Sequence, residues 1–266
     1  MSKGAAYYNQ DPDREWRRLD THVFEWATTM HYLKRYMSPG QTVLDLGGGP
    51  GRYALALNRL GHRVTLADLA EENLHFAQTK AEEQKTSLAG YVHVDARHLT
   101  PFGDGTFDTA LALGPLYHLL EEADRVQAIR ECLRVLKPGG LLAVAFISTY
   151  GALYDAVVTD PASLQKWRPR LRLFMATGIH QAPVEGGTCT DAWFADPYEI
   201  GPWMGQFSLD PVCLIGAESM LAQSKYILYQ QPSHILDEWI DFACETAESP
   251  AALAGSEHLV YFGRKR

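Results

Sequence analysis

The chain has 266 residues, of which 46% are hydrophobic and 21% charged, and its formal net charge at pH 7 is −8. This length and composition are typical of one large globular domain with insertions rather than two complete domains. The negative balance argues against a broad basic face for nucleic acid, although it leaves room for a local basic patch. No apolar run reaches the roughly 18 residues of a membrane-spanning helix, and no signal-peptide pattern is present, so we expect a cytoplasmic protein. The four scattered cysteines form no CxxC pair, which argues against a disulfide framework or a thiolate zinc site.

The segment from Asp11 to Tyr36 shows helical periodicity, with apolar side chains at three- and four-residue steps. Arg18 and His22 lie four residues apart, and Glu25 follows on approximately the same face. A solvated polar face is the simpler interpretation. If this face turns inward, Arg18 is suited to bind a ligand carboxylate. We interpret residues 1–38 as a helical lid.

From Thr42 the pattern alternates between short apolar strands and amphipathic helices. The expected strands are Val43–Leu46, Val64–Ala67, Tyr91–Val94, Thr109–Leu113, Leu141–Ile147, Pro211–Gly216 and His258–Gly263. The expected helices are Tyr53–Leu60, Ala70–Gln84, Glu121–Leu136, Pro197–Phe207 and Ile235–Thr246. Continuous apolar strands separated by helices predict an α/β fold with a doubly wound, mostly parallel seven-stranded sheet, spanning residues 39–149 and 191–266. In such sheets ligands bind beyond the carboxyl ends of the strands.

The alternation is interrupted after Ile147 by a stretch rich in aromatic residues, arginine and proline. We interpret residues 150–190 as an inserted cap over the active site, with a purely structural helical excursion as the alternative. Within it, His180 is expected to be an exposed loop histidine. Loops at strand ends commonly carry function on a rigid scaffold.

A glycine-rich loop, Asp45-Leu46-Gly47-Gly48-Gly49-Pro50-Gly51-Arg52, connects the first expected strand to the following helix. A phosphate-binding P-loop requires Lys-Ser/Thr after its last glycine, whereas Arg52-Tyr53 stands here. A G-x-G-x-x-G dinucleotide fingerprint also fails in either register. The remaining pattern is D-x-G-x-G-x-G. Its carboxylate would repel a pyrophosphate but attract a cationic amino group; a tight turn with a capping Asp is the alternative.

Acids also follow the next two expected strands. Asp68 comes about 20 residues after the glycine loop, where a carboxylate can accept hydrogen bonds from both ribose hydroxyls or can cap the next helix. Asp95 and Ala96 end the third strand, where they can offer an acceptor and an amide to an adenine edge. Three acids at three successive strand ends are hard to explain as caps alone.

On these residues, together with Leu133-Arg134-Val135-Leu136-Lys137-Pro138-Gly139-Gly140-Leu141, the chain resembles the class I S-adenosylmethionine-dependent methyltransferases over roughly Thr42 to Ile147. The resemblance implies S-adenosyl-L-methionine as cofactor and S-adenosyl-L-homocysteine as product. It implies that Asp45 orients the methionine end, Asp68 the ribose, and Asp95 with Ala96 the adenine. The full set of implied cofactor residues is Tyr8, Arg18, Asp45, Gly47, Gly48, Gly49, Gly51, Asp68, Leu69, Asp95, Ala96, Leu113 and Gly114.

Methyl transfer from a sulfonium depends mainly on proximity and orientation. Where the acceptor arrives protonated, a near-neutral histidine can serve as base, and His118 follows the fourth strand end where the methyl group would lie. The alternative for His118 is a structural role as the cap of the following helix. Tyr117 would either line the acceptor pocket or belong to the core. No His, Asp or Glu spacing suggests a metal site.

We therefore predict a methyltransferase acting on a small-molecule O, N or S acceptor, as a monomer or homodimer, with no nucleic acid or membrane partner. One alternative is an RNA or protein methyltransferase, for which the candidate basic cluster is Lys166, Arg168, Arg170 and Arg172. Another is a non-catalytic cofactor-binding protein.

Overall fold

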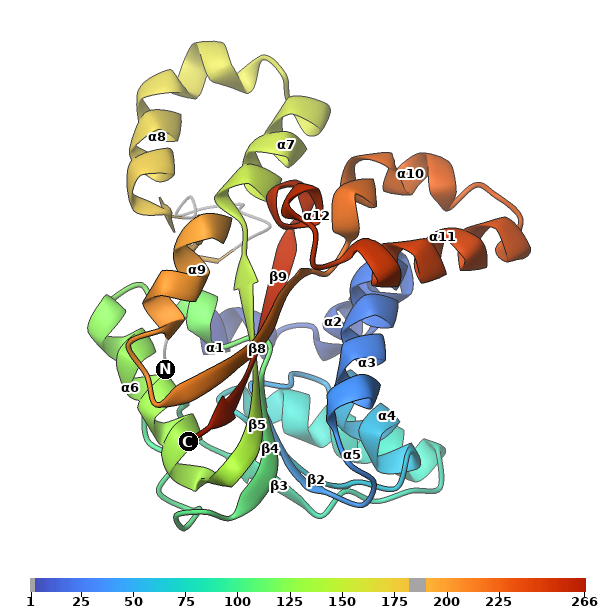
Figure 1. The fold of residues 1–266 in the computed structure, drawn as a ribbon, viewed down its shortest axis with the longest axis vertical. Helices are drawn as coiled ribbons and strands as arrows, with labels where there is room; N and C mark the ends of the chain where they lie inside the picture. Colours follow the sequence, from blue (N-terminus) through green and yellow to red (C-terminus); the bar gives the residue numbers. More distant parts are fainter. Residues whose placement is uncertain (1–2, 182–189) are drawn as a thin grey trace.

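The structure, a computed structural model, describes residues 3–181 and 190–266. Its main sheet has seven strands in the order β3-β2-β1-β4-β5-β9-β8 (Figure 1). These strands are β1 (Thr42–Leu46), β2 (Arg63–Asp68), β3 (Gly90–His93), β4 (Phe107–Ala112), β5 (Leu136–Ile147), β8 (Leu209–Gly216) and β9 (His258–Lys265). In the sheet order, each of the first four strands pairs in parallel with the next. Strand β9 then runs antiparallel to both of its neighbours, β5 and β8. The predicted doubly wound, mostly parallel seven-stranded sheet is confirmed.

Helices cover both faces of this sheet. One face packs against α3 (Val23–Tyr36), α4 (Arg52–Arg59) and α5 (Glu71–Glu83), and the other against α6 (Glu122–Val135) and α9 (Pro197–Met204) (Figure 1). Further helices are α1 (Lys3–Tyr8), α2 (Pro12–Thr21), α10 (Lys225–Leu228), α11 (Ser233–Thr246) and α12 (Pro250–Gly255), with 3-10 turns η1 (Leu116–His118) and η2 (Ser219–Ser224). Among the helices of the described ranges, none combines the length and apolar character that crossing a bilayer requires.

The central strands are continuous apolar runs because helices cover both faces of the sheet and bury the side chains on each face. In β4 and β5, successive side chains alternate between the two helical layers: Ala110 and Leu142 belong to one hydrophobic cluster, Leu111 and Ala143 to the other. Strand β5 begins at Leu136 rather than at the expected Leu141, because Leu136 already pairs with Phe107 of β4 before the register shifts.

The N-terminal segment forms two helices on different paths, so the expectation of one continuous helical face was wrong. His22 is both the C-terminal cap of α2 and the N-terminal cap of α3, with a non-helical backbone (φ −117°, ψ 52°). Glu25 therefore lies on a different helix from Arg18. Helix α3 is part of the core, with Phe24 and Leu33 fully buried.

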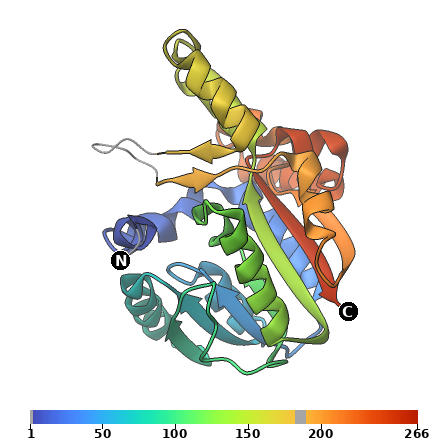
Figure 2. The same cartoon turned by 90° about the vertical axis from the view of Figure 1, so that its left-hand side faces the viewer.

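The stretch after β5 contains α7 (Thr149–Thr159), α8 (Ser163–Thr177) and β6 (Ile179–His180), which pairs antiparallel with β7 (Ala192–Trp193). Helices α7 and α8 stand away from the sheet, beyond the end of β5 (Figure 2). The expectation that His180 is an exposed loop histidine was wrong, because strand pairing leaves it half-buried. Residues 182–189 of the expected cap, including Cys189, lie outside the described residues; Cys132, Cys213 and Cys244 are free thiols.

Candidate active site

A cavity of about 1230 Å³ lies where β1, β2, β3 and β4 end, between the N-terminal helices and the α7–α8 segment. Its position follows from the parallel sheet, since the carboxyl ends of these strands meet at one edge. Every residue that the sequence assigned to cofactor or catalysis, except Gly51, lines this cavity. Gly51 is buried as the N-terminal cap of α4 with φ +83°, and a Cβ there would lie 3.1 Å from Ala77 Cβ.

The glycine loop is shaped by close contacts that leave no room for side chains. A Cβ on Gly48 would lie 2.5 Å from Cγ of Asp45 and 2.6 Å from Cδ1 of Leu66. Gly47 adopts φ +63°, and a Cβ on Gly114 would lie 2.8 Å from the Gly47 carbonyl oxygen. The loops after β1 and β4 therefore pack directly on one another. A glycine is required at position 48 because the Asp45 side chain fills the space that a Cβ would occupy.

Asp45 is fully buried in β1 beneath this loop, and neither carboxylate oxygen has a hydrogen-bond partner among the described residues. Burial raises the pKa of Asp45 to about 7, and the charge of Asp68 adds to the increase. The nearby backbone N–H of Ala54 opposes this increase without making a hydrogen bond of normal geometry. An unpaired buried carboxylate is costly unless a ligand supplies a donor or a positive charge. The cavity therefore offers a place for a cationic donor at Asp45.

Asp68 is also buried, but its oxygens are partnered by backbone amides. The Gly49 N–H donates to Oδ2 at 2.8 Å, and the Ala70 N–H donates to Oδ1 at 2.7 Å. Burial raises the pKa of Asp68, and these amides together with Asn73 oppose the shift. Each carboxylate oxygen can accept a further hydrogen bond, so Asp68 both braces the glycine loop and presents acceptors to the cavity.

Asp95, two residues beyond β3, forms a bidentate ion pair with Arg97, with contacts of 3.0 Å to Nε and 2.6 Å to an NH2 nitrogen. Hydrogen bonding by Arg97 lowers the pKa of Asp95. Arg97 in turn donates to Asp124 of α6 at 2.8 Å. The sequence analysis missed this partner, which keeps Asp95 ionised at the wall beside Ala96.

His118 lies in η1, after β4, at the junction of three separate segments. Its Nε2 is 2.9 Å from the Tyr8 hydroxyl, and its Nδ1 is 3.2 Å from Oγ1 of Thr190. Burial lowers the pKa of His118 to about 4, although the backbone of Asp191 opposes the shift. The near-neutral pKa that the sequence analysis assumed is thus not found here, because the desolvated ring disfavours positive charge. Tyr117 donates to the Leu113 carbonyl at 3.4 Å, and burial raises its pKa to about 12.

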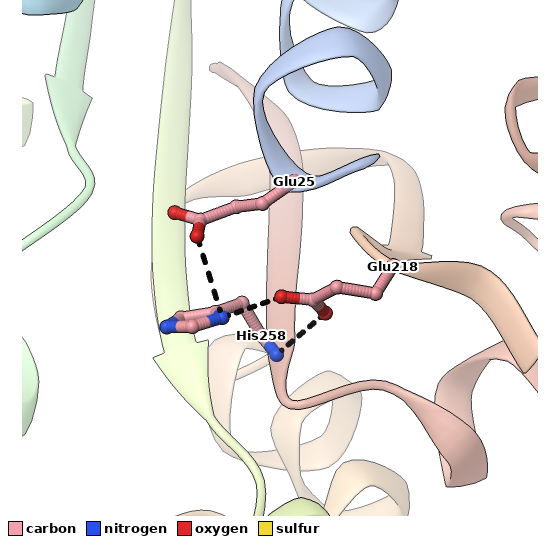
Figure 3. Close-up of side chains that lie close together, drawn as sticks. All are labelled: Glu25, Glu218 and His258. Carbon is pink, nitrogen blue, oxygen red and sulfur yellow. Dashed lines mark hydrogen bonds and ion pairs between the residues drawn. The ribbon is translucent and has the colours of Figure 1, made fainter. Parts of the chain in front are cut away.

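A chain of ionic groups alternating in charge runs from the cavity wall into the protein. Arg18 donates to both oxygens of Glu25 at 2.7 and 2.9 Å, and Glu25 Oε2 lies 3.7 Å from Nδ1 of His258. The same Nδ1 lies 2.6 Å from Oε1 of Glu218, whose other oxygen accepts from the His258 N–H at 3.0 Å (Figure 3). Despite the cost of burial, Glu25 and Glu218 raise the pKa of His258 to about 9, while Arg18 and His258 lower that of Glu25 to about 2.

Glu25, Glu218 and His258 have ligand atoms that lie within 4.8 Å of one another, as in a metal site. In this structure the positive charge between the carboxylates comes from Arg18 and the protonated imidazole of His258. Both oxygens of Glu25 and both of Glu218 already accept from protein donors. The donor set is therefore satisfied as an ion-pair network.

Sequence reasoning missed other residues that shape the cavity. Arg125 of α6 is buried and donates to the carbonyls of Leu119 and Leu120 at 2.6 and 2.7 Å, which holds the segment after His118. Its guanidinium carbon lies 3.9 Å from the ring centroid of Trp193. Arg125 falls within an amphipathic helix like other surface arginines, so no local signal distinguishes it.

The sheet order and the acids at its strand ends define a Rossmann-like fold with a large cavity at the carboxyl edge of the sheet. Comparison with known proteins agrees. Residues 44–144 match the model of a methyltransferase domain. A ubiquinone biosynthesis O-methyltransferase of Caulobacter vibrioides is 38% identical over 109 residues, which cover 41% of this chain and 42% of that protein. The matched stretch is thus less than half of the relative's length.

Two solved structures share the fold over nearly the whole chain. A S-adenosylmethionine-dependent methyltransferase of Methanosarcina mazei has a TM-score of 0.58 at 20% identity, covering 88% of this chain and 96% of that one. The 1,6-didemethyltoxoflavin-N1-methyltransferase of Burkholderia thailandensis has a TM-score of 0.56 at 17% identity, with coverages of 99% and 89%. Residues 44–144 therefore match a methyltransferase domain, and the chain as a whole shares the fold of S-adenosylmethionine-dependent methyltransferases.

Proposed function

We propose that this protein transfers the methyl group of S-adenosylmethionine to an O, N or S atom of a small molecule. The observation that carries the proposal is a single cavity with two differently lined parts. One part has the glycine loop and the acids Asp45, Asp68 and Asp95. The other lies under α7, α8 and β6, where aromatic side chains line it, and its total volume exceeds that of a typical single-ligand pocket.

The acidic part fits the cofactor group by group. The unpaired carboxylate of Asp45 would bind the amino group of the methionine end, and Asp68 would accept from the ribose hydroxyls. Asp95 and Ala96 would lie at the adenine edge, with Leu113 and Gly114 along the sulfonium side. Gly47, Gly48 and Gly49 would let the cofactor approach the backbone closely. When bound, this group supplies an electrophilic methyl carbon with a neutral thioether leaving group.

The acceptor part is lined by Trp167, Leu171 and Phe174 of α8 and by Phe194 after β7. Apolar and aromatic walls with few polar groups suit a small organic acceptor. The curated relative is named as an O-methyltransferase of ubiquinone biosynthesis, and the structural neighbour as an N-methyltransferase of a toxoflavin precursor. Both names support a small-molecule acceptor for this chain.

The chain's own contribution to the reaction would be orientation and exclusion of water. Tyr8, Tyr117 and His118 line the cavity and would align the acceptor atom with the methyl group. With a pKa of about 4, His118 is neutral at pH 7 and would act through hydrogen bonds, with little capacity to retain a proton. The bond to the acceptor would form as the carbon–sulfur bond breaks, and an acceptor proton would pass to solvent.

Helices α1 and α2, together with the α7–α8 segment, would act as covers over this cavity. Arg52 of α4 holds α2 in place by donating to the Trp16 carbonyl at 2.9 Å and to Asp20 at 2.8 Å. The basic side chains Lys166, Arg168, Arg170 and Arg172 are exposed along α8 alone. One basic helix is a small footprint for RNA, which favours a small-molecule acceptor.

The test is calorimetry followed by a transfer assay. S-adenosylmethionine and S-adenosylhomocysteine should bind with micromolar dissociation constants, whereas NAD should not bind. Labelled cofactor should then modify members of a panel of phenols, catechols and heterocyclic amines. Binding of NAD without either methionine-derived ligand would overturn the assignment; cofactor binding without transfer to small molecules, RNA or protein would favour a non-catalytic role.

A further inference from the structure

The proposed reaction gives no role to the ionic chain of Arg18, Glu25, His258 and Glu218 beside the cavity. We propose, building on the proposed function, that Glu25, His258 and Glu218 are positioning residues that hold the Arg18 guanidinium as the receptor for the carboxylate of the cofactor's amino-acid end. The chemistry recognised is an α-amino acid zwitterion, with Asp45 at its cationic group and Arg18 at its anionic group.

The two proposed binding groups, Arg18 and Asp45, both act electrostatically on the side chain of Tyr53. Tyr53, in the first turn of α4, is buried and lies within electrostatic range of Glu25, Arg18 and Asp45. Arg18 and Asp45 line the same cavity. An amino acid carries its two charged groups on one carbon atom, so opposite charges near Tyr53 in one cavity suit that end of the ligand.

The guanidinium has donors left for a ligand. Two of its five N–H groups are directed at Glu25, and Nε lies 3.8 Å from Glu15 Oε2. The Arg18 side chain is 32% exposed, whereas Glu25 is 9% and Glu218 3% exposed. Arg18, Glu25 and His258 all line the cavity, and the arginine is the most exposed of the three.

The alternation of charges along the ionic chain keeps its Arg18 end positive. Along the line of contacts the groups are Arg18 (+), Glu25 (−), His258 (+) and Glu218 (−). Of these four, Glu218 alone does not line the cavity, so its negative charge balances His258 from behind. The charged groups around His258 are Arg18 of α2, Glu25 of α3 and Glu218, with His22 facing its ring at 6.4 Å. Burial lowers the pKa of His22, which leaves it neutral near pH 7, and the neighbouring Glu257 is paired with Lys225 at 2.6 Å. Loss of the His258 proton would leave Glu25 facing Glu218 across an uncharged ring.

Glu218 allows a sharp test because it does not line the cavity. Glu218→Gln keeps the side-chain volume and an oxygen acceptor but removes the charge that orients His258. We compare S-adenosylhomocysteine, which has the amino-acid end, with 5′-methylthioadenosine, which lacks it. Glu218→Gln should weaken binding of the first roughly ten-fold, by analogy with the loss of other orienting partners, and change the second less than about two-fold. Asp210→Asn, an exposed carboxylate paired with Arg266 on β8, is the matched control and should change neither.

A second measurement uses the wild-type protein and so does not depend on a variant that folds. The ligand is 5′-S-(2-carboxyethyl)-5′-thioadenosine. It keeps the carboxylate but lacks the α-amino group, which would itself titrate between pH 7 and 10. Its affinity should fall as pH rises through about 9, where His258 loses its proton, while that of 5′-methylthioadenosine stays constant.

The outcomes separate this inference from the proposed function. Equal weakening of both ligands by Glu218→Gln, no weakening of either, or a pH-independent affinity for the carboxylate thioether would overturn the positioning role. A wild-type protein that binds none of these adenosine thioethers would instead refute the proposed function.

Discussion

The hydroxyl of Tyr8 lies 2.9 Å from Nε2 of His118, and this hydrogen bond joins helix α1 to the segment that follows β4. The two rings also meet edge to face, with centroids 5.2 Å apart. Thr190, beyond the α7–α8 segment, approaches the other nitrogen of the same imidazole. Helix α1 and the residues just before β7 therefore meet at His118, beside the place proposed for the transferred methyl group.

Tyr8→Phe and His118→Ala should have non-additive effects on turnover. Both variants remove the Tyr8–His118 hydrogen bond, with a net value of about 0.5–1.5 kcal/mol, so Tyr8→Phe should slow transfer by roughly two- to ten-fold. His118→Ala also loses the contact to Thr190 and should slow transfer at least as much, and adding Tyr8→Phe to it should have little further effect. Rates and melting curves on each purified variant make the comparison. A fall of about 10²–10⁴ in His118→Ala alone, with cofactor affinity unchanged, would instead identify His118 as a general base.

Asp45→Asn should stabilise the ligand-free protein at pH 8 while weakening cofactor binding. The pKa of Asp45 is about 7 when folded against 3.8 ordinarily, so the folded state holds the proton more tightly. The free energy of unfolding therefore falls as pH rises from about 4 to 7, by up to roughly 4 kcal/mol, and this penalty is complete above pH 7. The advantage of the variant should thus grow between pH 5 and pH 8 in thermal melts. A variant that is less stable at pH 8, or that binds S-adenosylhomocysteine normally, would contradict the assigned role.

Gly48→Ala should destabilise the protein by about 1–3 kcal/mol and weaken cofactor binding, because the new Cβ would overlap Cγ of Asp45 and Cδ1 of Leu66. Gly201→Ala is the matched control, since a Cβ at that position in α9 has nothing within 4 Å. The control should be neutral or slightly stabilising. Chemical denaturation and calorimetry on both variants measure the contrast; equal effects would show that Asp45 does not require this glycine.

Asp68→Ala should weaken binding of S-adenosylhomocysteine by roughly ten- to a hundred-fold, as expected for lost hydrogen bonds to a charged group at about 1.5–3 kcal/mol. It should also lower the melting temperature, because the amides of Gly49 and Ala70 lose their acceptor. An unchanged dissociation constant with a lower melting temperature would restrict Asp68 to bracing the loop.

The segment from 150 to 181 should exchange its amide hydrogens faster than the sheet in the free protein, because α7 and α8 stand away from the core. Exchange should slow when cofactor and acceptor are both present. Mass spectrometry of peptides from this range and from β4 gives the comparison. Protection equal to that of β4 in the free protein would argue against a moving cover.

Local sequence patterns predicted the sheet, its helical layers and the edge at which the cavity lies. Apolar runs separated by amphipathic helices leave few alternatives to a doubly wound sheet, and a parallel sheet brings the strand ends together whatever the details of packing. Asp45, Asp68 and Asp95 could therefore be assigned to one site from their positions after three successive strands.

Only the tertiary structure determined how those side chains are partnered and charged. The ion pairs that link Arg18 and Glu25 to His258 and Glu218 join the beginning of the chain to its end, and no local spacing predicts such contacts. A pKa depends on desolvation and on charges from distant segments, so His118 and His258 shift in opposite directions although both are histidines at the same cavity. For the same reason, Gly48 gains its meaning only once Asp45 and Leu66 are placed beneath it.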